Sequence, residues 1–180
     1  ATALQRGGRK TLLVERHNIP GGCATSFVRG EFEFETALHQ LSGLGTEKNP
    51  FIMRNIFAQL GVMDKVEFIQ EHALYRLIVP GELDVTLPAS WEGVRSLLHD
   101  MFPEEVEAIN RFMQLCEKVT LESFIALPKA RLSNDEAVLK STCPNYVEYG
   151  FRPAQDVLDE FFSDAKLKSI LATYWLYLGV

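Results

Sequence analysis

The stretch Thr11–Cys23 reads TLLVERHNIPGGC and says more about the fold than any other part of the 180-residue chain. The apolar run Thr11–Val14 has the length and composition of a buried parallel strand. Glu15 then lies at the carboxyl end of that strand, where open α/β sheets bind their ligands. A carboxylate at this edge can accept hydrogen bonds from a ribose diol. The stretch therefore predicts half of a nucleotide-binding site.

The residues before this stretch fit the second half of a β-α-β unit. Ala1–Arg6 is expected to form the last turns of a helix, and Gly7 and Gly8 stand where a left-handed residue would end it. A dinucleotide-binding fold opens with a strand and a G-x-G-x-x-G turn roughly 20 residues before the acid. Only 14 residues precede Glu15, and they contain no such turn. We therefore expect the chain to begin inside the first helix of a nucleotide-binding unit.

Composition excludes several classes of protein. Hydrophobic residues make up 47 % of the chain and charged residues 23 %, a balance typical of folded globular proteins and not of disordered ones. The net charge of −6 and the absence of a basic block argue against a nucleic-acid partner. Cys23, Cys116 and Cys143 have neither disulfide-framework nor metal-ligand spacing, which fits a reducing compartment, cytoplasmic or organellar. No run approaches the roughly 18 apolar residues of a membrane span.

Hydrophobic periodicity predicts both strands and helices in the rest of the chain. A half-exposed strand is expected around Gly30–Glu35, and a helix over Phe51–Leu60 that ends at Gly61. Alternating apolar residues over Ala73–Leu87, with a turn at its centre, predict a β-hairpin. Four further helices are expected: one after an N-cap at Ser90, one with Pro103 in its first turn, Pro153–Phe162 and Asp164–Leu178. The assignment of Leu127–Tyr149 stays open because prolines interrupt it.

Two segments carry a resemblance to a known family. The first is LLVERHNIPGGCATSFVRGEFEFETALH at residues 12–39, and the second is PAQDVLDEFFSDAKLKSILATYWLYLG at residues 153–179. On these segments the chain resembles the FAD-dependent oxidoreductases that include phytoene desaturase, carotenoid isomerase and retinol saturase, relatives of the flavin amine oxidases. The resemblance covers nearly the whole chain, but the family's first strand, glycine loop and carboxyl half have no counterpart in it.

The resemblance implies the architecture and the partners. The expected fold is α/β, with a partial FAD-binding Rossmann-like region over 1–50 and an α+β substrate region over 51–180. The implied cofactor is FAD, and the implied substrate is a long apolar polyene, carotenoid-like or retinoid-like. Because polyenes partition into lipid, peripheral membrane contact is a further expectation. The chain is expected to be a fragment, truncated at both ends, and its oligomeric state stays open.

The resemblance also assigns candidate cofactor-binding residues near the opening stretch. Glu15 matches the acid that holds the adenosine ribose, and Arg16 matches the basic residue that lies near the adenosine and phosphates. Gly21 and Gly22 match the family's second glycine motif, where the backbone comes close to the cofactor and a Cβ would obstruct it. An exposed acid, a surface arginine and an ordinary turn are the alternative interpretations of the same residues.

Two further assignments depart from the family pattern. Cys23 stands where the amine oxidases often carry an arginine, so only its backbone N–H is expected to contribute, and a buried inert thiol is the alternative. His39 matches a histidine near the flavin, but Glu35 and Ala37 replace the usual aspartate and glycine before it. Three aromatic residues are candidates for an apolar tunnel or for core packing: Tyr174, Trp175 and Tyr177. No catalytic residue and no metal ligand is assigned.

Three functional hypotheses stay open from the sequence. The first is an FAD-dependent oxidoreductase or isomerase acting on a polyene, in which the flavin supplies the electron chemistry. The second is a non-catalytic fragment that does not bind FAD by itself, because the pyrophosphate-binding turn is absent. The third is a related enzyme: a flavin amine oxidase-like protein with another substrate or, less well supported, an NAD dehydrogenase. An NAD dehydrogenase gives no reason for Gly21 and Gly22.

Overall fold

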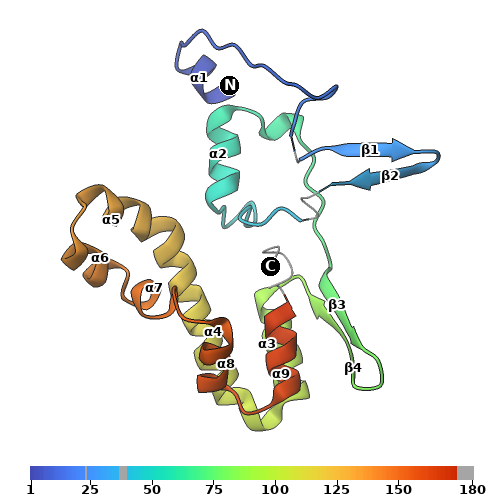
Figure 1. Cartoon of the computed structure of the whole chain (residues 1–180), viewed down its shortest axis with the longest axis vertical. Coiled ribbons are helices and arrows are strands. Elements are labelled where there is room, and N and C mark those ends of the chain that lie inside the picture. Colours follow the sequence, from blue (N-terminus) through green and yellow to red (C-terminus); the bar gives the residue numbers. More distant parts are fainter. Residues whose placement is uncertain (23, 37–39, 174–180) are drawn as a thin grey trace. The chain divides into compact units, whose positions relative to one another are not determined.

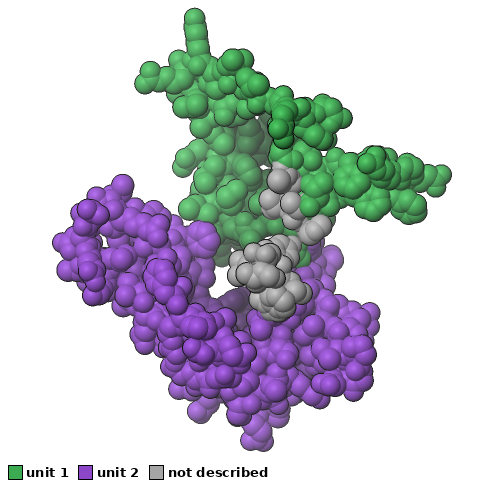
Figure 2. Space-filling model, viewed as in Figure 1, with its two compact units in different colours: residues 1–69 green, residues 70–180 purple. Residues whose placement is uncertain are grey.

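A computed structural model describes residues 1–22, 24–36 and 40–173 of the chain (Figure 1). The chain divides into two compact units, residues 1–69 (unit 1) and residues 70–180 (unit 2), which Figure 2 shows in green and purple. Helix makes up 53 % of the structure and strand 14 %, so the predicted mixed α/β class is confirmed. The functional division at residue 50 into a cofactor region and a substrate region stays a prediction.

Unit 1 contains one β-hairpin and short helices. Its elements are α1 (Thr2–Arg6), β1 (Ser26–Arg29), β2 (Phe32–Glu35), α2 (Ile52–Leu60) and the 3₁₀ turn η1 (Met63–Lys65). The sequence predicted α2 and its end: Gly61 is left-handed, with φ 64°, which glycine adopts without a steric penalty. The predicted strand around Gly30–Glu35 is β2, and its antiparallel partner β1 was not predicted.

The segment Thr11–Val14 is not a strand, so this part of the prediction was wrong. Its backbone has no ladder partner among the described residues, and Leu12 is 88 % exposed. A parallel strand forms only where a neighbouring strand accepts its N–H groups and supplies its own, and no described segment does so here. The glycine turn before this segment contains one left-handed residue. Gly8 (φ 75°) is left-handed, and Gly7 (φ −78°) is not.

Unit 2 opens with the predicted β-hairpin. Its strands are β3 (Ala73–Val79) and β4 (Leu83–Pro88), and they pair antiparallel with Leu77 opposite Val85. The alternation of β4 buries Val85 and Leu87 and leaves Asp84 and Thr86 exposed. This half-buried pattern is the one that the period-2 sequence predicted.

Helices make up most of the remaining described part of unit 2. They are α3 (Trp91–Met101), the 3₁₀ turn η2 (Pro103–Glu105), α4 (Val106–Leu121), the π turn η3 (Glu122–Ala126), α5 (Leu127–Ser133), α6 (Glu136–Thr142), α7 (Pro144–Tyr149), α8 (Ala154–Phe161) and α9 (Ala165–Ala172). Ser90 is the N-cap of α3 as predicted, because its Oγ accepts a hydrogen bond of 3.1 Å from the Gly93 N–H. The open segment Leu127–Tyr149 forms α5, α6 and α7, and Tyr174, Trp175 and Tyr177 lie outside the described residues.

The main core of unit 2 lies between the hairpin and helices α3, α4, α8 and α9. The largest side chains with almost no exposure are Leu98, Ile109, Leu167 and Ile170. A smaller cluster of Leu127, Ala130 and Cys143 joins α5 to the helices that follow it. Unit 2 therefore has a hydrophobic core of its own.

Candidate functional site

Glu15 projects from a local turn that keeps its carboxylate charged. Its Oε1 accepts a hydrogen bond of 2.9 Å from the His17 N–H. That bond, followed by the N–H groups of Arg16 and Gly21, lowers the pKa of Glu15 below its ordinary value, because each N–H favours the ionised form. The side chain is exposed to solvent. Glu15 is therefore an accessible, ionised hydrogen-bond acceptor, as recognition of a ribose diol requires.

The glycine pair belongs to the same turn. Gly21 has φ 129° and Gly22 has φ 60°, both in the region that favours glycine. A Cβ on Gly21 would lie 2.8 Å from the Thr25 Cγ2, so the turn itself needs a glycine there. A Cβ on Gly22 would meet nothing within 4 Å, so this residue faces open space. The two glycines therefore have different physical roles. Gly21 is required by the packing of the turn itself, and Gly22 leaves the backbone accessible from outside the turn.

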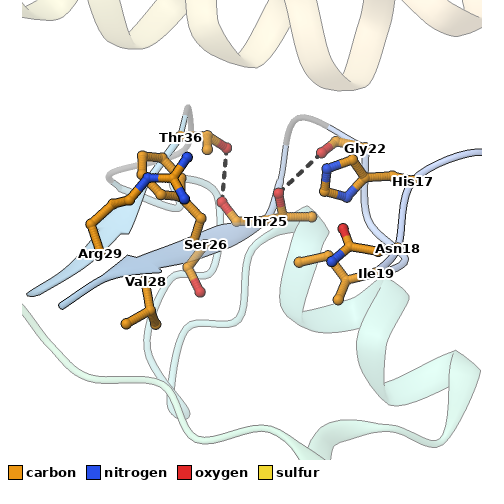
Figure 3. Close-up of a pocket in the computed structure, with 10 residues that line it drawn as sticks. His17, Asn18, Ile19, Gly22, Thr25, Ser26, Val28, Arg29 and Thr36 are labelled. Carbon is orange, nitrogen blue, oxygen red and sulfur yellow. Dashed lines mark hydrogen bonds between the residues drawn. The ribbon is translucent and has the colours of Figure 1, made fainter. Parts of the chain in front are cut away.

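An open pocket of about 780 Å³ lies between this turn and strand β1 (Figure 3). Gly22 lines it, together with Thr25 and Thr36. The Thr25 Oγ1 donates to the Gly22 carbonyl at 3.3 Å, and the Thr36 Oγ1 donates to the Thr25 carbonyl at 2.8 Å, as the dashed lines in Figure 3 mark. These two bonds join the glycine turn to the hairpin along one wall of the pocket.

The pocket is lined by a guanidinium group, an imidazole and an aromatic ring. His17 and Arg29 line it from the turn and the hairpin (Figure 3). The Arg29 guanidinium lies 5.5 Å from the centre of the Phe27 ring, which stacks on Phe34 at 5.2 Å. A cation supported by stacked rings suits an anionic or aromatic ligand. The arrangement fits a nucleotide better than an uncharged aliphatic molecule.

The structure brings only some of the predicted site residues together. Glu15 and Gly21 share one turn, and Gly22 lines the pocket beside it. Arg16 is exposed in the same turn and does not line the pocket. Cys23 and His39 lie outside the described residues, so their predicted roles stay predictions.

Sequence reasoning missed three of the polar residues that line the pocket, Thr25, Arg29 and Thr36. The local signal was weak, because hydroxyl residues and a single arginine occur in many surface hairpins. The partnership of Thr25 with Thr36 spans 11 residues and arises only from the hairpin register. A prediction of β1 as the partner of β2 would have placed these side chains together.

Other kinds of site find no support in the described part of the chain. No group of three or more His, Cys, Asp or Glu side chains there could hold a metal ion. Burial raises the pKa of the Cys116 thiol to about 11 and also raises the pKa of the Cys143 thiol, so both stay protonated at neutral pH. Among the described helices, none has both the length and the apolar character needed to cross a bilayer.

The chain is similar to a known domain family and to several known proteins. Residues 1–60 match the NAD(P)-binding Rossmann-like domain. The chain is 25 % identical to all-trans-retinol 13,14-reductase of Rattus norvegicus, over 96 % of this chain and 29 % of that protein. It is 26 % identical to the chloroplastic prolycopene isomerase of Daucus carota, over 95 % of this chain and 28 % of that protein.

The chain is similar to the retinol saturases and carotenoid isomerases. The family resemblance predicted from the sequence is thereby confirmed, and the family model that matches residues 1–60 is that of a Rossmann-like domain. The human all-trans-retinol 13,14-reductase matches in the same way, with 23 % identity over 100 % of this chain and 30 % of that protein. The chain thus spans less than a third of the length of these relatives. No solved structure matches it.

Proposed function

We propose that residues 1–60 bind the adenosine side of FAD in an oxidoreductase or isomerase that acts on a long apolar polyene. The observation that carries this proposal is the turn in which an ionised Glu15 lies beside Gly21 while Gly22 faces open space at the pocket. Support for a dinucleotide comes from the Rossmann-like match of the same residues. Support for the substrate class comes from relatives named for retinol and for prolycopene.

Each residue of the turn has a distinct part in the proposal. The Glu15 carboxylate accepts hydrogen bonds from the ribose hydroxyls, and the bare Cα of Gly22 lets the cofactor approach the backbone. Arg29 offsets the negative charge of the phosphates from the pocket wall, and the His17 ring offers them a hydrogen-bonding nitrogen. Arg16, Cys23 and His39 keep the roles that the family resemblance implies for them. A bound flavin supplies the electron chemistry, and the protein orients it and excludes water.

The first experiment tests Glu15 in the protein expressed at the full length of its coding sequence. Glu15→Gln removes the charge but keeps the shape, and we expect FAD affinity to fall by about tenfold, since a hydrogen bond to a charged group is worth about 1.5–3 kcal/mol. Glu31→Gln, an exposed acid in the β1–β2 turn, is the matched control and should bind FAD normally. Flavin absorbance after purification and FAD titration give the readout.

Two results would overturn the FAD proposal. One is a full-length protein that binds NADP and carries no flavin. The other is an equal FAD affinity in the Glu15→Gln variant and the Glu31→Gln control. Product analysis with all-trans-retinol and a panel of carotenoids tests the substrate class separately. Turnover of amines in place of polyenes would favour the amine oxidase-like alternative.

A second proposal concerns the 180-residue chain by itself: it does not hold FAD at micromolar concentrations. No described residue of unit 1 is buried, so no packed core holds the turn and the pocket in place. Leu12, Leu13 and Val14 are at least 71 % exposed, although their composition suits a buried strand. Titration of the isolated chain with FAD, followed by flavin fluorescence, should give no saturable signal. A saturable signal would contradict this second proposal and would leave the first one intact.

A further inference from the structure

One face of the β1–β2 hairpin carries two stacked aromatic rings and a guanidinium group. Phe27 lies opposite Phe34 in the strand register, and Arg29, two residues along β1 from Phe27, shares that face. The centres of the Phe27 and Phe34 rings are 5.2 Å apart, and the ring planes are 16° from parallel. The central carbon of the Arg29 guanidinium lies 5.5 Å from the centre of the Phe27 ring, within the range of a cation–π contact. We call Phe34, Phe27 and Arg29 the hairpin stack, in which Phe27 contacts both of the other members.

Only two members of the hairpin stack reach the pocket. Phe27 and Arg29 line it, and in the view of Figure 3 Arg29 lies on the side opposite His17. Phe34 does not line the pocket. Its ring packs on Phe27, and its side chain is 45 % exposed. An effect of Phe34 on a ligand in the pocket therefore has to pass through Phe27 and Arg29.

The Arg29 guanidinium is available for an anionic ligand. No carboxylate of the described residues forms a salt bridge with it. Glu33 belongs to the other face of the hairpin, where its Oε1 accepts a hydrogen bond of 2.6 Å from the Ser26 Oγ. A long arginine side chain loses rotamer freedom when it binds a ligand. A ring that already holds the guanidinium reduces this loss, so the stack prepares Arg29 for binding.

We propose that Phe34 is a positioning residue for phosphate binding in this pocket. Phe34 holds the Phe27 ring, and Phe27 holds the Arg29 guanidinium at the pocket wall, where its planar fork of N–H donors meets the phosphates of the nucleotide. The inference rests on the proposed function for the identity of that nucleotide. It extends the site to a residue that touches no ligand, on the strand of the hairpin that is farther from the pocket. Its consequence is that Phe34 contributes to affinity only while Arg29 is present.

The test is a double-mutant cycle in the protein expressed at the full length of its coding sequence and freed of bound flavin. The probes are FAD and ADP, which has the same adenosine diphosphate group but no flavin, and calorimetric titration measures their affinities. Arg29→Met should lower both affinities by about tenfold, since it removes a charged hydrogen-bond donor. Phe34→Leu should lower both by about two- to fivefold, the size of an exposed cation–π contact. In the Arg29→Met background, Phe34→Leu should cause no further loss.

Two variants serve as controls for the role of the ring. Phe32→Leu makes the same chemical change on the same strand and the same face, at a side chain that is 71 % exposed. Phe32 is not a member of the hairpin stack, so this variant should bind both probes as the wild type does. Phe34→Tyr keeps an aromatic ring at the position and should also retain wild-type affinity.

Three results would overturn the inference. The first is an equal ADP affinity in the wild type and Phe34→Leu, or a wild type that binds neither probe. The second is an equal loss in Phe34→Leu and Phe32→Leu. The third is a further loss from Phe34→Leu in the Arg29→Met background, because Phe34 would then support the fold of the hairpin and not the guanidinium.

The two probes separate this inference from the proposed function. A protein that binds ADP through Arg29 and Phe34 but binds no FAD would support the inference and contradict the FAD proposal. A protein that binds FAD with the same affinity in the wild type and Phe34→Leu would contradict the inference and leave the FAD proposal intact.

Discussion

Units 1 and 2 differ in what holds them together. No described residue of unit 1 is buried, whereas every buried residue of the described chain lies in unit 2. In unit 1 the structure depends on turns, a hairpin and individual hydrogen bonds, from the local bond between the His17 N–H and Glu15 to the bond from Arg6 to the Leu60 carbonyl, 54 residues away. In unit 2 it depends on a core that joins a hairpin to four helices. The residues proposed to bind the cofactor therefore lie in the unit with the weaker internal support.

The largest effect expected from this difference is on the free energy of unfolding of two leucine variants, one in each unit. Leu98→Ala in unit 2 removes a side chain with 0 % exposure, and we expect a loss of about 2–5 kcal/mol in the free energy of unfolding from transfer and cavity terms. Leu12→Ala in unit 1 removes a side chain that is 88 % exposed, and we expect a change within about 0.5 kcal/mol. Urea denaturation of the 180-residue chain measures both. Similar losses in the two variants would mean that unit 1 also has a core.

The elements that could be predicted are those with a complete local signal. The helix α3 has a serine N-cap and an apolar stripe, and α2 ends at a left-handed glycine. The hairpin β3–β4 has two alternating runs around a Pro80-Gly81-Glu82 turn. In each case the residues that determine the element lie within it or directly beside it.

The elements that were wrongly predicted or left open depend on residues elsewhere in the chain. Thr11–Val14 has the composition of a buried strand but no described neighbour to pair with. Leu127–Tyr149 forms three helices because Pro128 and Pro144 occupy first-turn positions, where the missing N–H costs nothing. The π turn before α5 has no sequence signature that we could identify, and it is held in part by Glu122, which reaches α7.

The candidate site was predictable to a similar extent. Glu15 was predicted from its place after an apolar run that is not a strand, and Gly21 and Gly22 were predicted from the family resemblance; in the structure all three belong to one turn. The pocket beside them depends on the fold of the β1–β2 hairpin, which brings Thr36 back to Thr25. Spacing alone could not predict that contact, because it requires the register of two strands.

Two glutamates, one in each unit, allow a second comparison. Replacing them should change the free energy of unfolding by an intermediate amount. Glu105 accepts bonds from the Ser163 N–H (2.8 Å) and Oγ (2.7 Å) and from the Asp164 N–H (3.1 Å), so it joins segments 58 residues apart. Among the described residues, Glu15 accepts hydrogen bonds from its own turn alone. We expect Glu105→Gln to lower the free energy of unfolding by about 1 kcal/mol, the low end for a charged acceptor near the surface. Glu15→Gln, the matched control, should leave it unchanged.

The stability difference between the wild type and Glu105→Gln should change with pH in a definite direction. The Ser163 hydroxyl, followed by the Ser163 N–H, lowers the pKa of folded Glu105 below the ordinary 4.5. A lowered folded-state pKa contributes stability above the unfolded-state pKa, and that contribution is lost as pH falls through the folded-state value. The difference between wild type and Glu105→Gln should therefore be constant above about pH 5 and shrink in acid. Urea denaturation at a series of pH values measures it, and a difference that grows in acid would contradict this assignment.

The smallest effects are expected for polar pairs on the two hairpins, where the units should behave alike. On β3–β4 the Arg76 Nε and Nη2 donate to the Asp84 carboxylate at 2.7 and 2.6 Å, and on β1–β2 the Ser26 Oγ donates to the Glu33 Oε1 at 2.6 Å. Both pairs are exposed, so water and salt screen them. Asp84→Asn and Glu33→Gln should both leave the unfolding midpoint within experimental error.

A small change in the pKa of Asp84, with an equally small change in stability, would show that the Arg76–Asp84 contact forms but is screened by solvent. The Arg76 hydrogen bond lowers the pKa of Asp84, so Arg76→Met should raise that pKa toward its ordinary value in an NMR titration. The unfolding midpoint of Arg76→Met at neutral pH should nevertheless stay close to that of the wild type, because an exposed pair loses little when it is broken. If Asp84→Asn destabilised the chain as much as Glu105→Gln, surface charge would contribute to the stability of unit 2 alongside its core. Burial would then no longer be sufficient to explain why the two units differ.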